Sequence, residues 1–571
     1  MTTASVDTAR ITKPKNDASA DPAYKAATAP GTPFEVGERN GIRQFVNAPS
    51  DLNLLIEGAK RFGERTCVVD FDSAGNERRI NYDQFFAWRD QLVPMLHIKR
   101  GDRVALCMRN RAEWLVGFLA VMKAGGIAVL MNSRGSGPEM LAMIEDTDPE
   151  LVMVDERRGA EIRAAGYNGR MFDMTKPLDP AELENRAAEY VPDNGVAQSD
   201  DPCAILFTSG TTGRAKGAVL THLNLITGLM TTQMSGVMVM HNVAKQMNIP
   251  VETLMANLPQ QAGLLVSPLF HVSGLGSGFL SPFMSGSKVV IMRRWDAQEA
   301  VRLIARESIT MFSAVPTMLW DILHRAKVAD VDIASLRNIA SGGQALPVNL
   351  VNELNALAPQ AQIGTGYGMT ECSGAIAQSV GPDFMARPAS AGRVLPMMDV
   401  RIEGPNGEAL APGEVGEIVV RGAVIMQGYW GRPEDTAAVL EPDGWLHTGD
   451  VGMVDDDGYI FIIDRKKDMV ISGGENIYCA EVERALGEIP QIVECATIGV
   501  PDERMGERLI AIVKAEGVTE AEIIDWVGQR LAKYKAPTRV YFSNESLPRN
   551  AVGKVDKVAL RKGWANLIGD Q

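Results

Sequence analysis

The sequence has 571 residues, more than a single hydrophobic core normally holds, so two or more domains are expected. Its 46% hydrophobic and 22% charged residues are typical of a soluble globular protein. A net charge of −14 argues against nucleic acid as a main partner and against a strongly basic membrane-binding surface. An acidic substrate would therefore need local basic patches on this chain.

The six cysteines lie far apart and form no C-x-x-C pair, which argues against a disulfide framework or a zinc site. A reducing cytoplasm is the simplest setting. The N-terminus carries no apolar h-region, so no signal peptide is expected. The longest apolar stretch, Trp114 to Asn132, is interrupted by Lys123 and is predicted to be a core helix followed by a strand.

The N-terminal half predicts alternating helices and strands after a polar tail over residues 1–45, which we expect to be disordered. Asn81 is predicted to cap a helix that continues through Leu92. The following β-α-β pattern predicts a largely parallel, doubly wound α/β fold. Its predicted elements are Arg103–Met108, Arg111–Lys123, Ile127–Met131, Leu151–Val154, Ala204–Phe207, Lys288–Met292 and Thr310–Ala314.

The pattern changes after about Gly392, where short strands are separated by hairpin turns. We therefore predict an N-terminal domain over residues 46–463 with a β-rich subdomain at 392–463. A hinge at 464–467 and a small, mobile α+β domain at 468–571 would follow. In that last domain a capping box at Thr519–Glu522 predicts a helix to about Tyr534.

Residues 206–217 contain the most informative loop of the chain. An apolar strand leads into Ser209, Gly210, Thr211, Thr212 and Gly213, and then into the cations Arg214 and Lys216. Backbone N–H groups, hydroxyls and a lysine together suit a polyphosphate. The spacing differs from the common P-loop, G-x-x-x-x-G-K-[ST]. A plain flexible loop is the alternative when this segment is taken alone.

Four later segments also carry polar residues on predicted loops. The first, Gly364 to Glu371, offers the flat ring of Tyr367 for a base and the carboxylate of Glu371 for Mg²⁺. The second ends at Asp450 on a turn that suits a ribose diol. The third and fourth are Asp464 to Asn476 and Pro548 to Lys554. Taken singly, each segment also fits an ordinary turn, linker or surface lysine.

All five segments, in this order, resemble those of the adenylate-forming superfamily, and in particular its stand-alone acyl-CoA synthetases. The resemblance extends from about residue 50 to residue 565. It implies that a carboxylic acid attacks the α-phosphorus of ATP to give acyl-AMP and pyrophosphate. A thiol, usually that of coenzyme A, then displaces AMP and forms a thioester. ATP, Mg²⁺ and coenzyme A are therefore the expected cofactors.

The resemblance also implies roles for single residues. Thr208 to Lys216 would hold the β- and γ-phosphates, Thr370 the α-phosphate, and Glu371 the Mg²⁺ ion. Lys554 would bridge the carboxylate and the α-phosphate, and His271 would lie near the carboxylate end of the acyl pocket. The remaining expected contacts to nucleotide or coenzyme A are Gly342, Gly343, Gln344, Gly366, Tyr367, Gly368, Met369, Asp450, Arg465, Lys467, Gly473 and Gly474.

Within that set, Asp450 and Arg465 would hold the ribose. The small domain would rotate about Lys467 between the two half-reactions, and Gly473 and Gly474 would then line the pantetheine tunnel. The chain departs from the family pattern at Ala215, Gln344 and Thr365, and residues 241–261 form an unusually long connection.

The identity of the acid is the least constrained expectation. Small apolar residues between Phe270 and Phe283 favour a medium- or long-chain fatty acid, with an aryl or arylalkanoic acid second. The acceptor could instead be a carrier protein acting in trans. A luciferase-like oxygenase and a non-catalytic AMP-binding protein are the alternatives from other classes. A homodimer is possible, and no transmembrane segment is expected.

Overall fold

The computed structural model describes most of the chain in two compact units. Within the described part, the first unit comprises residues 21–399 and 421–446, and the second comprises residues 12, 400–420 and 447–568. Every structural statement below concerns the residues that are described, which are 12, 21–72, 75–176, 185, 189–190, 195–208, 215–329, 333–342, 346–473, 475–550 and 554–568.

The N-terminal residues that are described are folded. Helix α1 (Pro22–Ala27) is capped by Asp21, whose carboxylate accepts the N–H of Ala23 at 2.8 Å. Its buried side chains lie against helix α8 (His222–Met247). Strands β1 (Val36–Arg39) and β2 (Ile42–Phe45) then form an antiparallel hairpin. Residues 21–45 therefore differ from the disordered tail that was expected up to residue 45.

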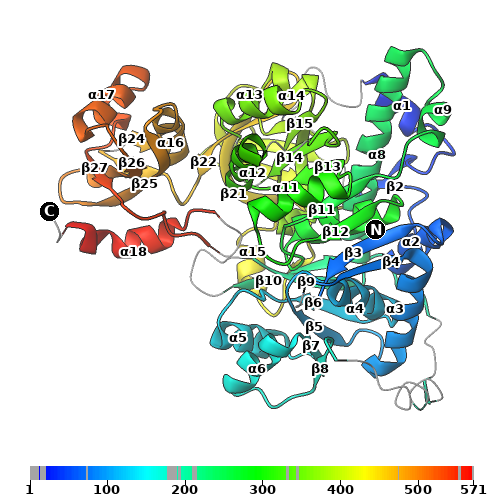
Figure 1. The fold of residues 1–571 in the computed structure, drawn as a ribbon. Helices are drawn as coiled ribbons and strands as arrows, with labels where there is room; N and C mark the ends of the chain where they lie inside the picture. Colours follow the sequence, from blue (N-terminus) through cyan, green and yellow to red (C-terminus); the bar gives the residue numbers. More distant parts are fainter. Residues whose placement is uncertain are drawn as a thin grey trace. The chain divides into compact units, whose positions relative to one another are not determined.

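The first sheet of the first unit is a parallel core with an antiparallel edge (Figure 1). Its order is β20-β10-β9-β6-β5-β7-β8, with β9 to β8 parallel and β10 antiparallel to both of its neighbours. The strands are β5 (Arg103–Cys107), β6 (Ile127–Leu130), β7 (Leu151–Val154), β8 (Met171–Asp173), β9 (Pro202–Thr208), β10 (Lys216–Thr221) and β20 (Gly428–Tyr429).

Helices cover both faces of this sheet (Figure 1). On one face Ala105 and Val129 pack with Met140 of α5 and Ile162 of α6. Alternate strand residues point the opposite way, where α4 contacts β5 and β6. The helices are α4 (Ala112–Lys123), α5 (Gly137–Thr147) and α6 (Glu156–Ala164), and α3 (Tyr82–Leu96) packs against α4. The predicted doubly wound arrangement is confirmed here.

A second sheet of the first unit has the same mixed character. Six parallel strands, β3, β12, β11, β13, β14 and β15, are flanked by antiparallel β4 on one side and by β16 and β17 on the other. The strands are β3 (Thr66–Phe71), β4 (Glu77–Asn81), β11 (Ala262–Leu265), β12 (Lys288–Ile291), β13 (Met311–Ser313), β14 (Asn338–Gly342), β15 (Gln362–Met369), β16 (Gly374–Val380) and β17 (Gly392–Val394).

Three amphipathic helices bury their apolar sides on one face of this second sheet and form a hydrophobic core with it. They are α11 (Ala297–Arg306), α12 (Pro316–Ala329) and α13 (Val348–Leu357). Shorter helices complete the unit: α2 (Leu52–Glu57), η3 (Gly58–Phe62), α9 (Val251–Ala256), η4 (Ser273–Leu280), α10 (Ser281–Met284), η5 (Thr370–Cys372), α14 (Pro382–Ala386) and α15 (Pro433–Ala437). The unusually long 241–261 connection is the end of α8 followed by α9.

The second unit contains β18 (Asp399–Glu403), β19 (Gly416–Arg421), β21 (Leu446–Val454) and β22 (Tyr459–Arg465), followed by a small α+β fold. The predicted β-rich region 392–463 is thus divided between the two units. The α+β elements are β23 (Val470–Ser472), β24 (Glu475–Ile477), α16 (Cys479–Gly487), β25 (Ile492–Asp502), β26 (Gly506–Ala515), α17 (Glu520–Arg530), η6 (Lys533–Lys535), β27 (Arg539–Phe542) and α18 (Lys557–Ile568).

Among the helices that the structure describes, none combines the length and the apolar character that crossing a membrane requires.

Candidate active site

The phosphate loop connects two antiparallel strands. Thr208 ends β9 and is paired with Lys216, the first residue of β10, and its hydroxyl donates to the Lys216 carbonyl at 3.4 Å. A strand follows this loop, whereas a helix follows the P-loop. Residues Ser209, Gly210, Thr211, Thr212 and Gly213 lie outside the described residues.

Lys216 has two close neighbours that the sequence did not reveal. Its Nζ lies 2.5 Å from Oδ1 of Asp435 and 5.2 Å from the ring centroid of Tyr429. The Tyr429 hydroxyl in turn donates to Oε1 of Glu371 at 2.9 Å. The hydrogen bond and charge of Lys216 lower the pKa of the Asp435 carboxyl. The cation of the phosphate loop and the expected magnesium ligand therefore share one tyrosine as a neighbour.

The glycine-rich segment before Glu371 is a strand. Gly366, Tyr367, Gly368 and Met369 all lie in β15, with Gly342 of β14 paired to Gly366. The backbone of Gly368 passes so close to the Gly374 carbonyl in β16 that a Cβ atom at Gly368 would overlap it. The ring of Tyr367 is buried. Gly343 and Gln344, expected beside the adenine, are not among the residues described.

Thr370 and Glu371 form the short helix η5 directly after β15. Both are buried, with Glu371 only 7% exposed. The backbone is held by Met426, whose N–H donates to the Glu371 carbonyl at 2.8 Å, and by Ser373 Oγ, which donates to Val424 O at 2.8 Å. A fixed, buried carboxylate is a hard oxygen ligand, so Glu371 fits the requirement of a magnesium site.

Asp450 and Arg465, the two residues expected to hold the ribose, are paired in the second unit. They lie opposite each other on β21 and β22, and Arg465 Nε is 2.6 Å from Asp450 Oδ1. Asp450 is only 2% exposed, and its N–H donates to Thr448 Oγ1 at 3.1 Å. The ion pair is therefore held in place by the register of β21 and β22.

Lys554 belongs to the same charge group. Burial of its ammonium lowers the pKa of Lys554, and the positive charges of Arg465 and Lys467 lower this pKa further. The negative charge of Asp450 raises it in part. The turn that carries Lys554 is closed by Asn550, whose N–H donates to the Lys554 carbonyl at 2.8 Å and whose Oδ1 accepts the Lys554 N–H at 3.0 Å. The structure thus brings four of the predicted site residues together.

Lys467 lies in the expected hinge at 464–467, and Gly473 follows it in the small domain, where it was expected to line the tunnel. Burial is the main cause that lowers the pKa of Lys467. Gly473 has a φ of +59°, a conformation that favours glycine, and its N–H donates to the Met505 carbonyl at 2.8 Å. Gly474, the other glycine expected in the tunnel, is outside the part of the chain that is described.

His271 lies just before the π-helix η4. Its Nδ1 is 2.9 Å from Ser273 Oγ, and its backbone N–H donates to the Pro268 carbonyl at 3.1 Å. A separate, small pocket with a cavity volume of about 10 Å³, about enough for one water molecule, lies beside the Glu371 segment. It is lined by Gly228, Thr231, Thr232, Ala375, Leu395, Met397, Met398 and Val424.

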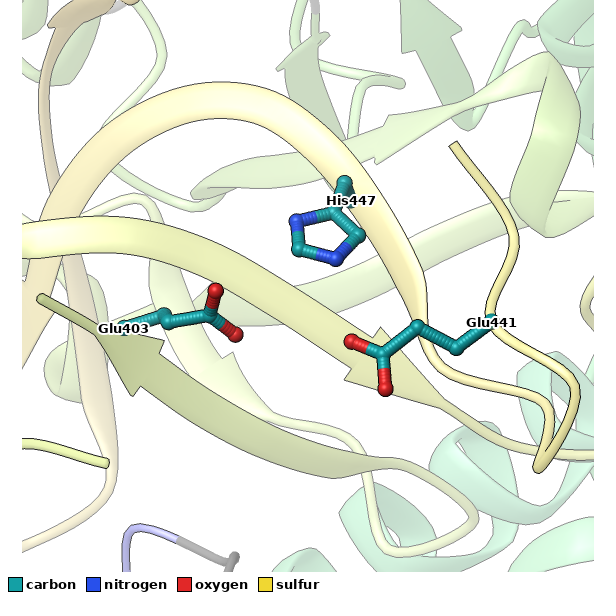
Figure 2. A group of neighbouring side chains, drawn as sticks. All are labelled: Glu403, Glu441 and His447. Carbon is teal, nitrogen blue, oxygen red and sulfur yellow. The ribbon is translucent and has the colours of Figure 1, made fainter. Parts of the chain in front are cut away.

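Figure 2 shows Glu403 and His447, which belong to the second unit, and Glu441, which belongs to the first. Within the second unit, His447 Nδ1 lies 3.5 Å from Glu417 Oε2, and Lys466 Nζ lies 2.8 Å from the same oxygen. These two partners lower the pKa of the Glu417 carboxyl to about 2 in spite of its burial. Partly exposed acidic groups are common on protein surfaces, and no metal is assigned to them here.

Comparison with known proteins gives a consistent result over nearly the whole chain. The profile of the AMP-binding enzyme family matches residues 55–430, and that of the AMP-binding enzyme C-terminal domain matches residues 481–554. Feruloyl-CoA synthase from an Amycolatopsis species is 37% identical over 81% of this chain and 89% of that protein. Long-chain-fatty-acid–CoA ligase FadD13 from Mycobacterium tuberculosis is 34% identical over 86% and 94%.

Solved structures of the same kind are similar to the fold. ATP-bound MatB from Rhodopseudomonas palustris has a TM-score of 0.74 at 28% identity and covers 90% of this chain and 99% of its own. o-Succinylbenzoate CoA synthetase from Bacillus subtilis, in complex with ATP and a magnesium ion, has a TM-score of 0.72 at 29% identity, covering 89% and 98%. Enzymes of this class use ATP, Mg²⁺ and coenzyme A. The chain therefore belongs to the AMP-binding enzyme family, among its AMP-forming acid–thiol ligases.

Proposed function

We propose that this acid–thiol ligase activates a hydrophobic carboxylic acid, with a medium- or long-chain fatty acid as the first choice. The acid and ATP would give acyl-AMP and pyrophosphate, and coenzyme A would then give the acyl-CoA thioester and AMP. The small apolar residues between Phe270 and Phe283, most of which form the π-helix η4 (Ser273–Leu280), are the observation that carries the choice of a hydrophobic acid.

The pocket is connected directly to the Glu371 segment. Ala375 in its wall is paired with Gly368 across β15 and β16, three residues before Glu371. On the opposite wall, the hydroxyls of Thr231 and Thr232 donate back to carbonyls of their own helix, Thr227 O at 2.7 Å and Gly228 O at 3.0 Å. Because both hydroxyls donate within the helix, methyl groups and methionines make up most of the pocket lining.

In the first step the negatively charged carboxylate of the acid must approach the negatively charged phosphates of ATP. The charged residues of the site would compensate for this repulsion. Lys216 and Thr208 would hold the terminal phosphates, and Thr370 would contact the α-phosphate. Asp450 and Arg465 would hold the ribose through the ion pair at 2.6 Å. Lys554 would neutralise the charge that develops between carboxylate and α-phosphate. Glu371 would hold Mg²⁺, which supplies further compensation for phosphate charge.

An aryl or arylalkanoic acid is the second candidate. The feruloyl-CoA synthase among the relatives supports the same candidate.

We further propose a reducing compartment such as the cytoplasm, because all six cysteines are free thiols and five are buried.

A screen of pyrophosphate release tests the proposal. Purified enzyme, Mg²⁺ and ATP are incubated with a panel of saturated fatty acids of graded length and of aryl acids, with and without coenzyme A. Acid-dependent release that coenzyme A stimulates, with formation of the matching acyl-CoA, supports the ligase. Preference for short polar acids would contradict the hydrophobic-acid proposal. Release without any thioester in the presence of coenzyme A would indicate another acceptor.

A further inference from the structure

Asp435 occupies a position that affects the charge of Lys216 directly. Its Oδ1 lies 2.5 Å from Lys216 Nζ, and the side chains are 35% and 19% exposed respectively. A carboxylate at this distance cancels much of the positive charge that Lys216 would otherwise offer to a phosphate. The contact joins residues 219 positions apart in the sequence, so it depends on the tertiary fold.

The backbone around Asp435 is fixed relative to the phosphate-loop strand. Strand β20 is paired with β10 through Tyr429 and Ala218, and Trp430 N–H donates to Gly217 O at 2.8 Å. Thr436 ties the start of α15 to this strand by accepting the Tyr429 N–H at 2.9 Å. The carboxylate of Asp435 is therefore held beside Lys216 by secondary structure.

A second cation is available to Asp435. Arg432 Nη1 lies 3.6 Å from Asp435 Oδ2, and Arg432 Nη2 lies 3.6 Å from Asp146 Oδ2. If Lys216 turned to a phosphate, Asp435 would keep a positive partner. The exchange of Lys216 from carboxylate to phosphate is thus possible without leaving an unpaired charge on the carboxylate.

We propose that Asp435 competes with the pyrophosphate group for Lys216, and so limits how tightly ATP and pyrophosphate are held. This rests on the proposed function, in which Lys216 binds the terminal phosphates. Pyrophosphate must leave before coenzyme A is used, and a preorganised cation without a counter-ion would hold this tetra-anion longest. Asp435 acts as a positioning residue, through Lys216, and favours release of the first product.

Asp435→Asn tests this with little change of shape. Removing the carboxylate charge should lower the inhibition constant of pyrophosphate, and the KM for ATP, by about 5-fold, the upper end expected for a partly exposed ion pair. Glu434→Gln is the matched control, because it makes the same charge change at the neighbouring, exposed residue. Arg432→Gln should act in the opposite direction, since Asp435 would then pair with Lys216 more firmly.

The measurements are pyrophosphate product inhibition and direct titration with magnesium pyrophosphate, with melting temperatures to confirm folding. Weaker binding in Asp435→Asn would mean that Asp435 orients Lys216 for phosphate, and it would overturn the proposal. If Glu434→Gln binds pyrophosphate as much more tightly as Asp435→Asn does, the effect comes from net charge alone, and the proposal is overturned as well. If Asp435→Asn does not fold, unchanged or tighter pyrophosphate binding by Arg432→Gln refutes it. Failure of the wild-type enzyme to exchange pyrophosphate into ATP with any acid would instead refute the proposed function.

Discussion

Asp450→Asn removes a buried negative charge from the second unit, where Asp450 lies near Arg465 and Lys554. The Asp450 carboxylate accepts from Arg465 Nε at 2.6 Å and is 2% exposed. Asparagine retains an acceptor oxygen but loses the charge. A hydrogen bond from the ribose to a charged acceptor would contribute about 1.5–3 kcal/mol, and one to a neutral acceptor about 0.5–1.5 kcal/mol. The difference of about 1–1.5 kcal/mol predicts a KM for ATP that is roughly 5–13-fold higher.

The same substitution makes a prediction about pH. The pKa of Lys554 is lowered by burial and by Arg465 and Lys467, while Asp450 opposes them. In the proposed function, adenylation needs the protonated ammonium of Lys554, so activity should decline as the pH rises through this lowered pKa. Without the Asp450 charge the pKa of Lys554 falls further, and the alkaline limb of the adenylation profile should move to lower pH.

Acid-dependent ATP–pyrophosphate exchange, measured over a range of pH and ATP concentration, checks both effects. Asp456→Asn is a matched control, since it removes a carboxylate from the exposed turn between β21 and β22. An alkaline limb that stays in place or moves to higher pH, together with an unchanged KM for ATP, would refute the placement of Asp450 beside the reacting groups.

Three further predictions concern activity and stability. Lys554→Ala should lower ATP–pyrophosphate exchange by about 10²–10³-fold and spare thioester formation from supplied acyl-adenylate; near-normal exchange would refute the role of Lys554. Burial raises the pKa of Asp464 from 3.8 to about 6, so this group's contribution to stability is full below about pH 4 and is lost as the pH rises through 6. The melting temperature of Asp464→Asn should therefore depend less on pH between 4 and 7 than that of the wild type, and parallel curves would contradict this. Asp70 is fully buried between Arg78 at 2.8 Å and Arg293 at 3.2 Å, so Asp70→Ala should lower the free energy of unfolding in urea by about 3–5 kcal/mol, and a change below 1 kcal/mol would be inconsistent with that burial.

Local signals in the sequence located many elements well. Asn81 and Thr519 were recognised as helix caps from their own neighbours, and both capping boxes are formed. The end of the second of these helices was placed at about Tyr534, but α17 ends at Arg530. There Leu531 adopts an extended backbone and packs against the core of the second unit. Such an end depends on tertiary contacts, which no local pattern contains.

The motifs identified the family correctly, but they did not predict tertiary contacts between residues that are far apart in the sequence. Residues 21–45 have the composition of a disordered segment, yet Tyr24 and its neighbours find a buried place against α8, about 200 positions further along the chain. The contact of Asp435 with Lys216 was missed for the same reason. Strand β20, which places it, has only two residues and no recognisable pattern. The roles assigned to the site residues, Thr370, His271 and Gly473 among them, all stay predictions.

The close approach of β15 and β16 limits how the acid preference could be re-engineered. At Gly368 any side chain would overlap the neighbouring carbonyl, and Gly374 has a φ of +136°, which other residues rarely adopt. Ala375, the next residue, lines the pocket and has an ordinary backbone. A mutant library aimed at new acids should therefore vary Ala375 and Thr232 and leave both glycines unchanged. Substitutions at these two positions would change the lining of the small pocket and leave the strand that leads to Glu371 in place.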